Sequence, residues 1–254
     1  MQNILTIEKH FPQNDEAALA TFARQYLLLR KKENRIYTDN ELLLLPDTAP
    51  SHQYYKEWQV RKKSCRRLLQ CLAQKKSPLQ ILEVGCGNGW LSAQLASLKN
   101  TTVTGIDINT AELQQAQRAF AGYSNLQFIN ATLNSSLLNE KVFDIIIFAA
   151  SVQYFPSVKK VIKAAMQHLT LQGEIHITDS PFYRQQEMAS ARQRTKEYFK
   201  SVNFPKMAHY YFHHSIDTLH PFTHQILYNP KSLVNRLRKN KNPFYHIVIT
   251  APHQ

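Results

Sequence analysis

The residues best placed to do chemistry form a short glycine turn that follows an acidic side chain. Gly85, Gly87 and Gly89 alternate after Glu83, and they are half of the six glycines in the chain. Glycines let a ligand approach the main chain closely, and a turn that opens a helix aims backbone N–H groups at it. The pattern therefore predicts a ligand site. It is not a dinucleotide fingerprint, which needs glycine at position 90, where this chain has Trp90.

The segments on either side of the turn have the patterns needed to position it. Residues 78–84 form an apolar run of strand length, and residues 90–98 have apolar side chains three and four positions apart, as one face of a helix requires. We therefore predict that a buried strand enters the turn and that a helix leaves it.

A second acidic residue stands at a distance that suits the same ligand. Asp107 ends a predicted strand over 102–107, 22 positions after Gly85. An acidic side chain about 20 residues after such a turn meets the hydroxyls of a ribose. The alternative is a cap for the helix that Asn109 opens, and the glycine turn favours the ribose.

These motifs together resemble those of the class I S-adenosylmethionine-dependent methyltransferases, over about a hundred residues from 79 to 183. The resemblance implies an α/β fold, with a doubly wound, mostly parallel seven-stranded sheet. It also implies S-adenosyl-L-methionine as the cofactor. The activity implied is methyl transfer to an oxygen, nitrogen or carbon nucleophile of a small-molecule acceptor.

The resemblance also implies which residues contact the cofactor. Glu83 would lie near the methionine amino group, Asp107 at the ribose and Asn130 at the adenine, although family members frequently have aspartate where Asn130 stands. The expected cofactor-binding residues are Glu83, Gly85, Cys86, Gly87, Asp107, Ile108, Asn130, Ala131 and Ala149.

The acceptor side is less specific. An apolar run over 142–150 predicts a central strand, and Ala149-Ala150-Ser151-Val152 replaces the Asn/Asp-Pro-Pro-aromatic cluster of enzymes that methylate DNA amines. The pattern is closer to small-molecule methyltransferases. A base is needed only if the nucleophile must lose a proton. The candidates for catalysis are Tyr154, Asp179 at the end of a fifth strand (174–179), and His213 or His214 as a base.

The two ends of the chain are predicted to cover this core. Residues 1–77 read as a helical extension, with one helix capped by Asn14 or Asp15 and a second running from a Ser51 cap to about residue 74. Tyr54, Tyr55 and Trp58 on that second helix either line the substrate cavity or belong to the core, and the core is favoured. Residues 78–254 would form the methyltransferase domain, with a lid at 181–222. Strands over 223–228 and 244–250 would be the antiparallel pair that closes the sheet.

Charge and composition leave other readings open. The formal net charge is +13, yet three basic residues face five acidic ones over 79–155, so the excess lies in the flanks. These flanks are solvated helix faces, or they attract an anionic acceptor, a membrane surface or RNA. An RNA methyltransferase and a non-catalytic binding module are the alternatives to a small-molecule enzyme.

Location and metal content can also be predicted. No apolar run approaches the roughly 18 residues that span a bilayer, and no signal peptide is visible. The cysteines, Cys65, Cys71 and Cys86, have neither metal-ligand nor redox spacing. We therefore expect a cytoplasmic protein. The histidines between 209 and 224 match no metal motif, so no metal is predicted.

Overall fold

The computed structural model describes residues 16–75, 78–237 and 241–251. Its centre is a seven-stranded sheet with the strand order β3-β2-β1-β4-β5-β9-β8. Strands β1 to β5 pair in parallel, and β9 pairs antiparallel with both β5 and β8. The predicted α/β fold and its closing antiparallel pair are therefore confirmed. The strands are β1 (Leu79–Val84), β2 (Thr101–Asp107), β3 (Leu126–Asn130), β4 (Phe143–Ala149), β5 (Leu169–Thr178), β8 (His224–Tyr228) and β9 (His246–Thr250), with a separate pair β6 (Phe182–Tyr183) and β7 (His214–Ser215).

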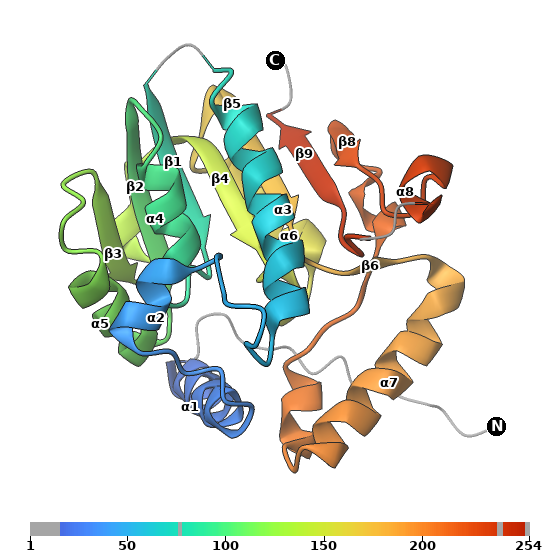
Figure 1. Cartoon of the computed structure of the whole chain (residues 1–254). Helices are drawn as coiled ribbons and strands as arrows, with labels where there is room; N and C mark the ends of the chain where they lie inside the picture. The colour runs from blue at the N-terminus through green and yellow to red at the C-terminus, as the bar shows by residue number, and fades with distance from the viewer. Residues whose placement is uncertain (1–15, 76–77, 238–240, 252–254) are drawn as a thin grey trace.

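Helices cover both faces of the sheet (Figure 1). Helices α3 and α4 lie on the face toward the viewer and α6 lies behind it, while α1 and α7 lie below the carboxyl ends of the parallel strands. The helices are α1 (Glu16–Lys32), α2 (Asp39–Leu44), α3 (Tyr55–Leu72), α4 (Trp90–Ala96), α5 (Thr110–Ala119), α6 (Val158–Met166), α7 (Met188–Ser201) and α8 (Leu233–Leu237).

The central strands are apolar because both of their faces are buried. Ile145 and Ile147 of β4 pack in one core cluster with residues of α3 and α4, and Ile146 packs in another with residues of α6. Parallel strands between two helix layers need such continuous apolar runs, because successive side chains point to opposite faces. The isoleucine run of the sequence is thus the centre of the sheet.

Two predicted helix boundaries were wrong. Ser51 does not cap α3, which begins at Tyr55 after Tyr54, because the imidazole of His52 accepts the Tyr54 N–H (3.0 Å) and holds a turn there. The apolar spacing of Val161, Ile162, Ala165 and Leu169 after Ser157 predicts a second helix, which would reach Leu169. In the structure α6 ends at Met166, since Leu169 pairs with Phe143 and begins β5. The predicted caps Asn14 and Asp15 lie outside the described residues. The proposed division at residue 77 and the lid at 181–222 stay predictions.

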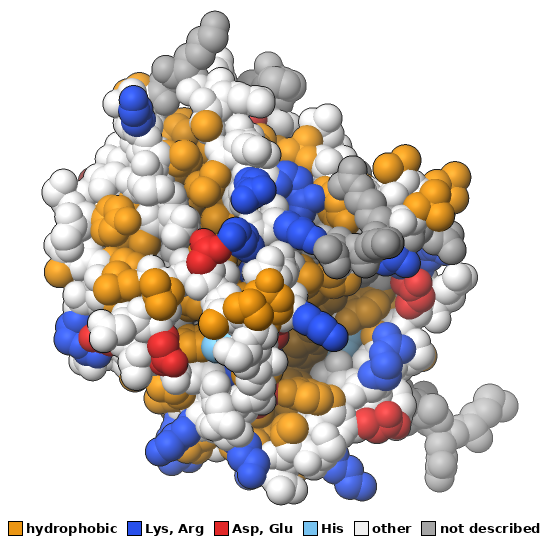
Figure 2. All heavy atoms as spheres, viewed as in Figure 1, with side chains coloured by type: hydrophobic (Ala, Val, Ile, Leu, Met, Phe, Trp, Pro, Cys, Tyr) orange, Lys and Arg blue, Asp and Glu red, His pale blue; other side chains and the backbone are white. Residues whose placement is uncertain are grey.

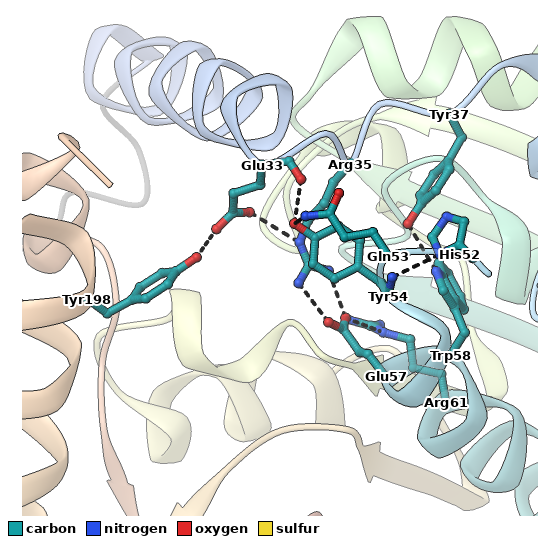
Figure 3. A network of polar contacts seen from close by, with 10 residues as sticks. All are labelled: Glu33, Arg35, Tyr37, His52, Gln53, Tyr54, Glu57, Trp58, Arg61 and Tyr198. Carbon is teal, nitrogen blue, oxygen red and sulfur yellow. Dashed lines mark hydrogen bonds and ion pairs between the residues drawn. The ribbon is translucent and has the colours of Figure 1, made fainter. Parts of the chain in front are cut away.

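A polar network ties the segment after α1 to α3 and α7 (Figure 3). The guanidinium of Arg35 donates to both carboxylate oxygens of Glu57 (2.9 and 2.7 Å) and lies over the ring of Tyr54, 3.6 Å from its centroid. The hydroxyl of Tyr198, on α7, donates to Glu33. This network fixes the end of α1 near the strand ends.

Candidate active site

One pocket, called here the central pocket, lies where β1, β2, β3 and β4 end. Its floor comes from the glycine turn and the residues after β2 and β3, and its roof comes from α1. Open parallel sheets bind their ligands at this edge, outside the carboxyl ends of the strands. Its wall includes Phe22, Ala23, Tyr26, Gly85, Gly87, Asp107, Ile108, Ala131, Ser151 and Tyr154.

The glycine turn needs its glycines for two different reasons. Gly85 and Gly87 line the pocket with φ of 75° and 53°, a left-handed conformation that other residues rarely adopt. A Cβ on Gly85 would stand 2.7 Å from Cβ of Ser151. Gly89 has the same left-handed φ of 75° and also serves packing, because a Cβ there would stand 2.5 Å from the ring of Phe128. The main chain at Gly85 and Gly87 is thus open to a ligand.

Asp107 lines the pocket with its carboxylate held in place from behind. Its Oδ2 accepts the N–H of Gly87 (2.8 Å) and its Oδ1 accepts the N–H of Asn109 (2.8 Å). Burial raises the pKa of this carboxyl, and the backbone N–H bonds oppose that rise. Each oxygen keeps a further acceptor site, which fits the two hydroxyls of a ribose. The residue that caps α5 is Asn109 and not Asp107, because the Asn109 side chain accepts the N–H of Glu112.

Glu83 and Cys86 lie behind the turn and do not form part of the pocket wall. Glu83 is 3% exposed, accepts a hydrogen bond from the hydroxyl of Ser92, and has a pKa that burial raises to about 8. Burial also raises the pKa of the Cys86 thiol well above its usual range. Their contacts with the cofactor stay predictions.

The side of the pocket expected to take adenine contains some of the predicted residues and some others. Ile108 and Ala131 line it. Asn130 is exposed and donates its amide to the carbonyl of Asp107 (3.2 Å), while Ala149 ends β4 and its neighbour Ala150 lines the wall. Sequence reasoning missed the apolar side chains that complete this end, Leu133, Val161 and Ala164. For Val161 and Ala164 the available signal was the apolar helical spacing of α6, which predicts a helix but does not assign it to a site.

The part of the pocket around the catalytic candidate Tyr154 is built from aromatic rings. Tyr154 lines the pocket, and its ring lies 5.6 Å from that of Tyr26 and 5.4 Å from that of Phe22, centroid to centroid. Burial raises the pKa of Tyr154, so its hydroxyl stays protonated at neutral pH. Phe22 and Tyr26 lie on α1 at helical spacing with Leu19 and Ala23, a pattern that predicts a helix face but assigns it to no site.

The other catalytic candidates are not brought to the pocket. Asp179 is 6% exposed beneath α3, where the hydroxyl of Ser64 donates to it at 2.5 Å. His214 is buried and donates from Nε2 to the carbonyl of Val152 (3.1 Å). His213 lines a neighbouring hollow instead. Of the four candidates, Tyr154 alone lines the central pocket.

Of the three aromatic residues at the start of α3, Trp58 belongs to the core, as favoured from the sequence, and Tyr54 is half-buried against it. Trp58 is 4% exposed, and its indole N–H donates to the hydroxyl of Tyr37 (3.0 Å). Its ring also meets that of Trp90 edge to face, 5.3 Å between centroids. Tyr54 and Tyr55 are likewise absent from the wall of the central pocket.

The family model for a methyltransferase domain matches residues 75–251. The chain belongs to this family. The resemblance seen in the glycine turn is confirmed, and with it the class of enzyme, methyltransferases that use S-adenosylmethionine.

Named relatives agree with this family. The malonyl-[acyl-carrier protein] O-methyltransferase of Halalkalibacterium halodurans is 29% identical over 47% of this chain and 47% of its own length. The ubiquinone biosynthesis O-methyltransferase of Rickettsia prowazekii is 32% identical over 38% of each chain. The match with the first of these thus spans about half of the relative. The plantazolicin methyltransferase BpumL, solved with a pentazolic desmethylPZN analog and SAH, has a TM-score of 0.51 at 14% identity and covers 93% of this chain and 99% of its own, which shows the shared fold.

Two further features of the described residues concern metal ions and membranes. Within the parts of the chain that the structure describes, no three His, Cys, Asp or Glu side chains gather where a metal ion could be held. In the same residues, no helix combines the length and the apolar character needed to cross a bilayer.

Proposed function

We propose that this protein transfers the methyl group of S-adenosylmethionine to a small-molecule acceptor. The observation that carries the proposal is the pairing of an open glycine main chain with the Asp107 carboxylate in one pocket. Gly85 and Gly87 would contact the amino-acid part of the cofactor and Asp107 its ribose. The cofactor supplies an electrophilic methyl group. The residues of the chain align the acceptor and exclude water from it.

The pocket wall favours a nucleophile that needs no base. Among the described residues that line it, Asp107 is the only carboxyl group and histidine is absent. Tyr154 keeps its proton because burial raises its pKa. A carboxylate is already ionised at neutral pH and can attack without losing a proton. We therefore propose a carboxylate oxygen as the methylated atom, which is consistent with the malonyl O-methyltransferase among the relatives.

The basic residues of α3 support a small acceptor over RNA. Figure 2 shows Lys and Arg side chains gathered over this helix. Several are already engaged within the protein: Arg61 pairs with Glu57, Lys62 pairs with Asp47, and Arg67 lies over the ring of Tyr228. These contacts support the interpretation that the basic face of α3 has a structural role and is otherwise solvated. A cytoplasmic location is part of the proposal, supported by three free cysteines.

Calorimetry with S-adenosylmethionine and S-adenosylhomocysteine tests the proposal on the wild type and on Asp107→Ala. The variant should bind about 5–150-fold more weakly, because losing a partner of buried polar groups costs about 1–3 kcal/mol. Glu197→Ala, which removes an exposed carboxylate on α7, is the matched control and should bind like the wild type. Failure of the wild type to bind either ligand would overturn the proposal.

A further inference from the structure

A second hollow, called here the cationic hollow, lies directly beside the central pocket. It is formed by one face of α7 and by the segment that leads into β7. Pro156 lines both spaces. The side chains that give the hollow its chemistry are Arg192, Thr195, Lys196, Tyr211 and His213.

The charged side chains that line this hollow are all positive. Arg192 and Lys196 are four residues apart on α7, so both side chains project from the same side of the helix. Among the described residues neither of them forms an ion pair, and Asp and Glu are absent from the wall. This differs from α3, where Arg61 and Lys62 each have a carboxylate partner. Two cations without an internal partner are available to an external anion.

The neutral groups of the hollow are fixed in position. Nε2 of His213 and Oγ1 of Thr195 are hydrogen-bonded at 2.9 Å. Burial, followed by the nearby Arg192, lowers the pKa of His213 to about 4, so the ring is neutral at physiological pH. His213 thus braces β7 against α7. The positive charge comes from Arg192 and Lys196.

Aromatic rings separate the hollow from the central pocket by one layer. The ring of Tyr154, in the pocket, meets that of Tyr211, in the hollow, with 5.9 Å between centroids. A molecule that passes over Pro156 beside these rings would reach both spaces. One end of it would lie near the nucleophile position and the other near the two cations.

We propose that the cationic hollow binds an anionic group of the acceptor, a carboxylate or a phosphate, while the acceptor's nucleophile occupies the central pocket. Arg192 supplies a planar fork of donors that matches such a group, and Lys196 adds a second charge. The inference rests on the proposed function and adds the class of acceptor: a small molecule with an anionic group distant from the methylated atom.

Titrations with inorganic pyrophosphate and with succinate, in the presence of saturating S-adenosylhomocysteine, test the hollow without a known acceptor. Phosphorus NMR line widths report the first probe and proton line widths the second, and the two arms distinguish phosphate from carboxylate. The double variant Arg192→Ala/Lys196→Ala is compared with Lys200→Ala/Lys206→Ala, which removes two exposed positive charges from α7 and the turn after it without touching the hollow. S-adenosylhomocysteine binding by calorimetry verifies that each variant is folded.

The wild type and the control should bind at least one probe alike, and the hollow variant should bind it about tenfold or more weakly, because charge-assisted hydrogen bonds are lost. Equal binding by the hollow variant and the control would overturn the inference, as would a wild type that binds neither probe. If S-adenosylhomocysteine does not bind to the wild type, the proposed function is wrong. The probe titrations can then be repeated without S-adenosylhomocysteine, and they still test whether the cationic hollow binds anions.

Discussion

At the scale of single residues, two carboxyl groups next to the glycine turn, the half-buried Asp107 and the buried Glu83, differ in what they contact. Asp107 accepts two backbone N–H groups, which favour its ionised form. Glu83 accepts a hydroxyl, from Ser92, and burial raises its pKa to about 8. One carboxyl is therefore prepared to accept hydrogen bonds from a ligand. The other is held protonated until a cation or a rise in pH removes its proton.

This difference predicts a pH dependence of stability in the protein without ligand. Because the pKa of Glu83 in the fold lies above its unfolded value of 4.5, the fold binds the extra proton, and stability falls as pH rises from about 4.5 to about 8. The fall is about 1.4 kcal/mol for each unit of pKa difference. Urea unfolding between pH 5 and pH 8.5 should show Glu83→Gln losing less stability than the wild type. Glu197→Gln, on an exposed site, should follow the wild type; parallel curves for all three proteins would contradict the assignment.

At the scale of elements, α1 forms the roof of the central pocket through the side chains of one face. Phe22 and Tyr26 project from it toward Tyr154, and Ala23 between them lines the same space. Asn109, which caps α5, also donates its amide to the carbonyl of Ala23 (3.4 Å). The roof is thus attached to the residues next to Asp107.

Replacing Phe22 by alanine should weaken cofactor binding while the sheet stays intact. The substitution removes a half-buried ring that packs against Tyr154, and truncating a packed aromatic side chain opens a void that the neighbours fill only in part. We expect S-adenosylhomocysteine to bind about tenfold more weakly by calorimetry, a change of about 1.4 kcal/mol. Leu28→Ala, on the same helix and 47% exposed, is the control. Equal affinities for the two variants would mean that α1 is not part of the binding wall.

The elements also show which features a sequence can predict. The glycine turn and most strands of the sheet were predicted because their signals are local: glycines at alternate positions, apolar runs and an acidic residue at a fixed interval. Asp179 was not placed, because its partner Ser64 lies 115 residues away. The predicted Ser51 cap was wrong for a local reason: the neighbouring His52 accepts the backbone N–H of Tyr54. The role of Phe22 was hidden because a helix face looks the same whether it covers a core or a pocket.

At the scale of the whole molecule, the central pocket joins parts of the chain that are far apart in sequence. Its floor belongs to the sheet, whereas its roof belongs to the N-terminal helix, and the network of Arg35, Glu57 and Tyr198 connects that helix to α3 and α7 (Figure 3). A ligand in the pocket therefore contacts both parts and adds its binding free energy to their association.

Hydrogen exchange measured by mass spectrometry can detect this coupling. At S-adenosylhomocysteine concentrations about a hundredfold above its Kd, openings that release the ligand become about a hundredfold rarer, which corresponds to about 2.7 kcal/mol. Amides of α1 and of residues 85–89 should exchange correspondingly more slowly. Amides of β8 and α8, which do not line the pocket, should be unchanged and serve as the internal control. Slowing confined to residues 85–89 would show that the ligand binds the sheet alone, and that α1 does not act as a cap over it.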